Sequence, residues 1–99
     1  MAILSLAKKP RRLMVLGHEV TITYCRKMKG NDRGEFFTDP FRIRVLSDES
    51  WRSTLHHELM HMVLWVSGLS ELLGDDKEEA VVKALELGLA SILIIDTKV

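Results

Sequence analysis

The segment His57–His61 reads His-Glu-Leu-Met-His, and its two histidines and glutamate have the residue types and spacing of a zinc site. Residues four apart lie on the same face of an α-helix, so both imidazoles can reach one ion. Glu58 follows the first histidine, and it can take a proton from a metal-bound water without binding the metal itself. The spacing therefore predicts zinc ligands at His57 and His61 and a general base at Glu58.

The residues around this motif predict the helix that carries it. Ser47 is the expected N-cap, and Asp48 and Glu49 would place negative charge in the first turn, where the helix dipole favours it. Residues 51–67 contain no Gly or Pro, and Gly68 supplies the expected stop. Apolar residues at three- and four-residue spacing predict the buried face of this helix: Leu55, Leu59, Met62, Val63 and Val66. The histidines fall on an adjacent flank. The alternative is a helix with two exposed histidines and a chance glutamate.

A third protein ligand has to come from elsewhere in the chain. Residues 62–67 carry no histidine, which excludes a three-histidine site of the metzincin type. His18 lies far upstream and Cys25 stands alone, so both are weaker candidates. The better candidates are Glu78 and Glu79, which open a second expected helix.

Helical phase distinguishes these two glutamates. The second helix is expected after the loop Gly74–Asp76, capped by one of its aspartates, and should run from about residue 77 towards residue 95. Its apolar arc consists of Val81, Val82, Leu85, Leu89, Ile92 and Leu93. Glu78 falls near the centre of that arc, whereas Glu79 falls on a charged flank. Because a buried carboxylate needs a partner, zinc would explain Glu78. Glu78 is thus the preferred third ligand, with Glu79 as the alternative.

These segments together resemble a known family. Strands, then Thr54–His61, then a Gly-ended helix and the Glu-Glu-Ala-Val-Val segment 78–82 resemble the small zincin-like metallopeptidases of phages and prophages, which are similar to minimal gluzincins. The resemblance covers about residues 14–93. It implies that His57, His61 and either Glu78 or Glu79 hold a zinc ion. It also implies that Glu58 is the general base.

The chain also departs from the larger gluzincins. Val82 and Lys83 stand four residues after the two glutamates, where those proteins have an acid, and no second lobe forms a substrate cleft. The resemblance implies a zinc-dependent hydrolase of peptide bonds, with a peptide or protein as substrate. The departures and the small scaffold predict that its activity is weak or highly selective. A homo-oligomer or a protein partner would complete the cleft. The alternative is a zinc-stabilised phage regulatory or assembly module with weak or no catalysis.

Length and charge predict a single domain over residues 1–99, in which residues 1–12 would form a frayed basic terminus. The chain is 46% apolar and has zero formal net charge. Residues 1–52 carry 11 Lys/Arg against 6 Asp/Glu, but the neutral total favours a solvated surface over a nucleic-acid site. One cysteine excludes an intramolecular disulfide, and no segment is typical of export or of a membrane span. These features predict a cytoplasmic protein, in the host cytoplasm if it is phage-encoded.

The segment before the metal helix predicts β-structure. Residues 13–16 and 20–24 would form a hairpin around a turn at Gly17–His18, and residues 36–37 a short strand. Phe41–Val45 alternates apolar and basic residues, so one face should cover the helices while the other meets water. The expected fold class is α+β and zincin-like: a small antiparallel or mixed sheet packed on two main helices. A sheet edge beside the site could bind an extended peptide.

Overall fold

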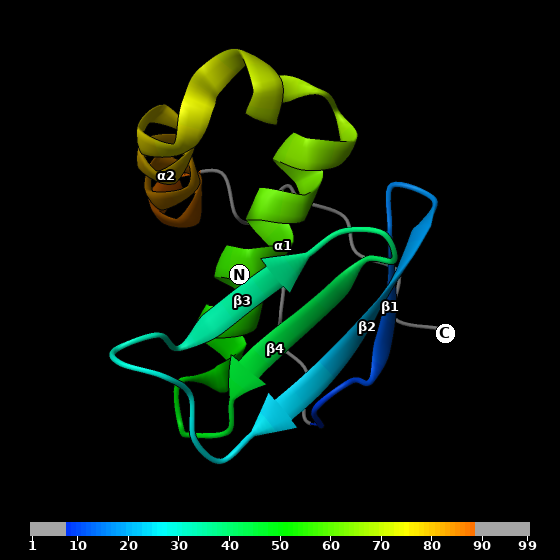
Figure 1. Cartoon of the computed structure of the whole chain (residues 1–99), viewed down its shortest axis with the longest axis vertical. Coiled ribbons are helices and arrows are strands. Elements are labelled where there is room, and N and C mark those ends of the chain that lie inside the picture. The colour runs from blue at the N-terminus through cyan, green and yellow to red at the C-terminus, as the bar shows by residue number, and fades with distance from the viewer. Residues whose placement is uncertain (1–7, 89–99) are drawn as a thin grey trace.

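The computed structural model describes residues 8–88. Four strands and two helices follow in the order β1 (Arg12–Val15), β2 (His18–Cys25), β3 (Gly34–Phe37), β4 (Arg42–Leu46), α1 (Trp51–Val66) and α2 (Leu69–Gly88). The strands form one mixed sheet in the order β1-β2-β4-β3, in which β2 and β4 are parallel and the outer pairs are antiparallel (Figure 1). The predicted α+β class, with a small sheet and two main helices, is confirmed.

A two-residue turn joins β1 to β2. Leu16 and Gly17 both have positive φ, at 51° and 81°, which suits the tight turns that match the twist of a hairpin. Val15 pairs with His18, so the turn lies one residue earlier than Gly17–His18, and His18 is already the first residue of β2. The hairpin prediction is correct and the position of its turn is wrong by one residue.

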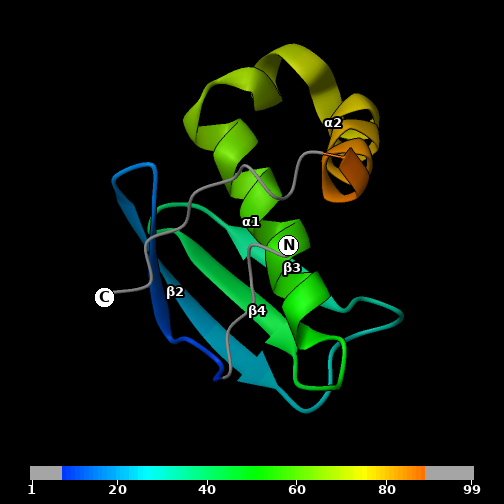
Figure 2. The ribbon, with the colours of Figure 1, turned by 180° about the vertical axis from the view of Figure 1, so that it is seen from behind.

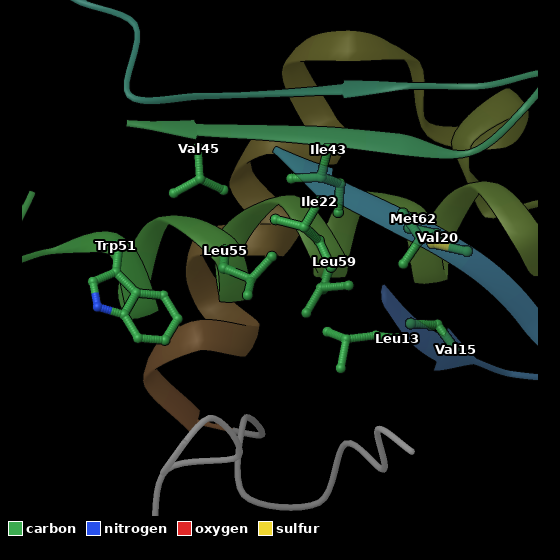
Figure 3. Packing of buried hydrophobic residues seen from close by; sticks show 10 residues of the cluster. All are labelled: Leu13, Val15, Val20, Ile22, Ile43, Val45, Trp51, Leu55, Leu59 and Met62. Atoms are coloured by element: carbon green, nitrogen blue, oxygen red, sulfur yellow. The ribbon is translucent and has the colours of Figure 1, made fainter. Parts of the chain in front are cut away.

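The two faces of the sheet differ as the alternation in β4 predicts. Ile43 and Val45 are fully buried, whereas Arg42 and Arg44 are exposed. α1 crosses the buried face of the sheet (Figures 1 and 2). Its apolar side chains point at those of the strands (Figure 3). The cluster consists of Leu13, Val15, Val20, Ile22, Ile43, Val45, Trp51, Leu55, Leu59 and Met62. This packing fixes α1, and therefore its histidines, relative to the sheet.

The start of α1 differs from the prediction. Ser50, not Ser47, is the N-cap residue, and its side chain makes no capping hydrogen bond. Ser47 follows the last residue of β4 directly, and its amide donates to Cys25 O of the neighbouring strand at 2.7 Å. The carboxylate of Asp48 accepts from the Ser50 amide at 2.9 Å, so this acid shapes the turn before the helix and does not lie in the first turn.

The second helix begins earlier than predicted. Gly68, with φ 82°, ends α1 as expected, but α2 starts directly afterwards at Leu69. The predicted break survives as a kink at Gly74, where φ is 76° and ψ is 166°. Val82 is buried and Val81 half-buried, as the apolar arc requires, and the other members of the arc lie outside the described side chains.

Over residues 8–88, α1 is the helix that covers the sheet. Among the described residues, α2 packs against α1 and makes no contact with the strands (Figures 1 and 2). A second, smaller cluster joins the helices: Met60, Leu64 and Val82, with Leu73 and Val81 packed against it. In the part of the chain that the structure describes, α1 uses two of its faces and lies between the sheet and α2, and the expected C-terminal end of the second helix lies outside that part.

The first described residues are joined to the sheet. Lys9 Nζ donates to Ser47 Oγ at 2.5 Å, and the Tyr24 hydroxyl donates to Pro10 O at 2.7 Å. The predicted frayed terminus lies outside the described residues over 1–7, and the expected end of the second helix lies outside them over 89–99. Within residues 8–88, neither helix combines the length and the apolarity that a membrane crossing requires.

Candidate metal centre

His57 and His61 lie one turn apart on the flank of α1 that faces α2. Their Nε2 atoms are 3.3 Å apart, and the ring planes make an angle of 65°. Both side chains are mostly buried, with 25% and 15% of their surface exposed. The packing of α1 on both neighbours holds this flank in place, so the two Nε2 atoms stay side by side.

Glu79 brings the third donor to the same point from α2. One carboxylate oxygen, Oε1, lies 2.8 Å from His57 Nε2, and the other, Oε2, lies 3.2 Å from His61 Nε2. These three side chains form a group whose donor atoms all lie within 4.8 Å of one another. The kink at Gly74 precedes this part of α2 and sets the direction in which its glutamates approach α1.

The spacing of these donors can be compared with the size of a zinc site. Zinc binds imidazole nitrogen and carboxylate oxygen at about 2.0–2.2 Å, so the edge of its tetrahedron is roughly 3.3–3.5 Å. The Nε2–Nε2 separation of 3.3 Å and the 3.2 Å from Glu79 Oε2 to His61 Nε2 lie at or slightly below that edge, and the other oxygen of Glu79 lies 2.8 Å from His57 Nε2. Two imidazole nitrogens and one carboxylate oxygen are also a donor set that zinc accepts. The residues present therefore fit a zinc ion with three protein ligands.

Glu78 also reaches the site, but at a different atom. Its Oε2 lies 2.5 Å from Nδ1 of His61, the ring nitrogen that does not face the other donors. Glu78 is the more buried of the two glutamates, at 17% side-chain exposure against 42% for Glu79, as helical phase predicts. The geometry nevertheless favours Glu79 as the third ligand, because its carboxylate reaches both Nε2 atoms. The carboxylate of Glu78 contacts Nδ1 of His61.

Glu58 is buried beside the two histidines. Only 9% of this residue is exposed, and burial raises the pKa of its carboxyl group. His57 and His61 partly oppose this increase in pKa, while the negative charges of Glu79 and Glu35 add to it. A carboxyl group with a raised pKa holds a proton more readily near neutral pH, which suits a group that must accept and return one.

Gly34, the first residue of β3, lies against this buried carboxylate. A Cβ at this position would come within 2.7 Å of Thr54 Cγ2 and within 3.0 Å and 3.1 Å of Glu58 Cγ and Oε2. The sequence patterns described above assign no role to Gly34. The available signal was a glycine at the start of an apolar strand segment, a pattern that marks close approach of a backbone to another group.

An open cleft of about 660 Å³ gives access to the site. Residues 31–34 form one wall, and the N-terminal half of α1 supplies Ser50, Ser53 and Thr54. The remaining lining residues are the site itself: His57, Glu58, His61 and Glu79. His18 and Cys25, the weaker ligand candidates, do not line this cleft: His18 packs edge-on against Phe41, and Cys25 Sγ accepts from Arg44.

The chain was also compared with known proteins. No family model, curated protein or solved structure matches it significantly. Any statement about its activity therefore depends on the chemistry of the cleft.

Proposed function

We propose that this protein is a small zinc-dependent peptidase of the zincin-like type, with His57, His61 and Glu79 as metal ligands and Glu58 as general base. The observation that carries the proposal is the convergence of two histidines and one glutamate, with donor atoms within 4.8 Å of one another, beside a buried carboxylate. A zinc ion held there would polarise a substrate carbonyl and lower the pKa of water towards neutrality.

The ligand set leaves room for a substrate. Three protein ligands are typical of catalytic zinc sites, whereas structural sites are closed by four. Among the described residues, the group of donors contains only two histidines and one glutamate. These three side chains line the open cleft, so an ion held by them would be accessible to a further ligand. This arrangement supports a hydrolase more than a purely structural metal site.

Glu58 would carry the proton during hydrolysis. Its carboxylate would take a proton from the attacking water and deliver it to the amide nitrogen that leaves when the peptide bond breaks. Burial against Gly34 and Thr54 holds the carboxylate in one place, and its raised pKa favours the protonated form between the two transfers. The same residue would be of little use to a protein that only needed zinc for stability.

The edge of β3 is suited to bind an extended peptide. β3 is the last strand of the sheet, and its other neighbour is absent among the described strands. The Leu46 amide donates to Arg33 O at 2.7 Å, so by the alternation of antiparallel pairing the backbone groups of Gly34 and Phe36 point away from β4. Gly34 also lines the cleft. A peptide added to this edge would cross the cleft beside the metal position.

The test compares wild type with Glu58→Gln on a broad peptide library, with and without added zinc. We expect zinc-dependent cleavage by wild type and a loss of about 100-fold or more for Glu58→Gln, since general base catalysis is worth roughly 10²–10⁴-fold. Zinc content should be equal in the two proteins. Glu71→Gln, which removes an exposed acid from α2, is the matched control and should cleave like wild type.

Two results would contradict the proposal. Cleavage that survives Glu58→Gln would remove Glu58 from the mechanism. Zinc binding without cleavage of any library member by wild type would favour the alternative, a zinc-stabilised module that acts through its surface in phage regulation or assembly.

A further inference from the structure

We infer that Glu78 is a positioning residue for His61: its carboxylate holds the proton on Nδ1 and so directs the Nε2 lone pair at the metal position. This inference rests on the metal site proposed above. It assigns different roles to two adjacent glutamates, one as a ligand and one as a group that orients a ligand.

The imidazole of His61 lies between these two glutamates. Glu78 Oε2 is 2.5 Å from Nδ1, and Glu79 Oε2 is 3.2 Å from Nε2. The two nitrogens are on different edges of the ring, so the glutamates approach it from different sides. Glu78 therefore cannot take the place of Glu79 at the metal position without a rotation of the ring, and the two residues are not interchangeable.

The burial of Glu78 supports this role. A carboxylate with 17% exposure has lost most of its water, which is costly unless a donor replaces it. Nδ1 of His61 lies 2.5 Å from this carboxylate and can supply that donor, since hydrogen bonds to an ionised acceptor are short and strong. The ring thus accounts for the inward position of Glu78 without a metal contact. Glu79 is 42% exposed and needs no such partner.

The chemistry of imidazole connects this hydrogen bond to metal binding. A neutral ring carries one proton, and only the other nitrogen has a lone pair for a metal. A carboxylate only accepts hydrogen bonds, so Glu78 favours the form with its proton on Nδ1. Nε2, on the other edge of the ring, is the nitrogen that lies beside Glu79 and the Nε2 atom of His57. The negative charge of Glu78 beside Nδ1 also raises the basicity of Nε2, which strengthens its bond to a metal.

The direct test is the position of the His61 proton in the zinc-free protein, read from long-range ¹H–¹⁵N NMR spectra at about pH 8, above the ordinary pKa of imidazole. In wild type we expect the proton on Nδ1. In Glu78→Ala it should move largely to Nε2, whereas Glu78→Gln should retain the Nδ1 proton because its amide oxygen still accepts. Asp76→Asn, which removes an exposed acid two residues earlier, is the control and should match wild type.

Zinc affinity gives a second measurement. Loss of a group that orients a ligand typically costs 10–100-fold in metal affinity, so we expect a loss of about that size for Glu78→Ala and less than about 10-fold for Glu78→Gln. Glu79→Gln should lose more than either. If Glu78→Ala does not fold, the comparison of Glu78→Gln with Glu79→Gln decides.

Three results would overturn the inference. They are a His61 proton on Nε2 in wild type, a proton that stays on Nδ1 in Glu78→Ala, and a loss of zinc in Glu78→Gln as large as in Glu79→Gln. The NMR test needs neither zinc nor cleavage. A protein that fails to bind zinc or to cleave peptides would therefore contradict the proposed function and leave the assignment of the His61 proton measurable.

Discussion

The face of α1 that packs on the sheet and the face that meets α2 differ in composition and in what holds them together. The sheet side is a continuous apolar cluster in which Leu55, Leu59 and Met62 are fully buried (Figure 3). The α2 side has a small apolar cluster next to two histidines and two glutamates. Apolar packing alone can hold the first interface, whereas the second depends in part on polar groups that also form the site. Metal binding should therefore stabilise the α1–α2 interface much more than the sheet.

The largest expected effect is on the sheet side. Leu59 is fully buried, so Leu59→Ala should lower the free energy of unfolding by about 2–5 kcal/mol. Because this side chain belongs to the cluster between α1 and the sheet, the loss should be equal with and without zinc. Urea unfolding in chelator and in excess zinc measures both values. A loss that zinc largely restores would contradict the division between the two faces.

A smaller effect is expected at the interface with α2. Val82 is fully buried against Met60 and Leu64, and Val82→Ala removes two methyl groups, so it should cost about 2 kcal/mol. Unlike Leu59→Ala, it should also weaken zinc binding in the folded protein, because it loosens the helix that carries Glu79. Zinc titration measures this effect. Leu72→Ala, which changes an 80% exposed residue of the same helix, should alter neither quantity. Unchanged zinc affinity in Val82→Ala would show that the site does not depend on this cluster.

Because Gly34 of β3 lies close to Glu58, a larger residue at position 34 should lower stability moderately and reduce cleavage. Gly34→Ala places a Cβ against Thr54 and Glu58, and such overpacking typically costs about 1–3 kcal/mol. We expect cleavage to fall more than zinc affinity, because the displaced group is the base. Thr54→Ala should recover stability in the double variant, and the base would remain displaced. Recovery of full activity in that double variant would argue against a positioning role for Gly34.

The smallest expected effect concerns the buried carboxyl group in the zinc-free protein. Burial raises the pKa of Glu58, so its ionised form costs stability above the folded-state pKa, and the cost disappears below the ordinary value of 4.5. Glu58→Gln should therefore be more stable than wild type at neutral pH, with a difference that shrinks as the pH falls. Unfolding curves in chelator from pH 8 to pH 4 measure it. A difference that grows towards acid pH would contradict the sign of the pKa shift.

Local patterns in the sequence predicted the interface with the sheet better than the interface with α2. The three- and four-residue spacing of Leu55, Leu59 and Met62 predicted the buried face of α1, and the alternation of β4 predicted the buried face of the sheet. Both signals are local, because each depends on the geometry of one element. The confirmed α+β class follows from them.

The site itself depends on how elements pack, which one element's sequence does not specify. Helical phase correctly turned Glu78 inwards, but what lies inside is the ring of His61, and the angle between the helices brings Glu79 to both Nε2 atoms. The contact between Gly34 and Glu58 joins residues from separate elements. For the same reason the sequence did not predict that the described part of α2 packs on α1 alone. The histidines on one helical flank were predictable, and their partners were not.

The most direct test of the central claim is the zinc content of the wild-type protein after purification without chelator, measured with Glu79→Gln in parallel. The account predicts about one zinc per chain for wild type, which three N/O ligands and an open fourth position would hold, and a large loss for Glu79→Gln. A stable wild-type protein that contains no zinc and does not bind added zinc would contradict it.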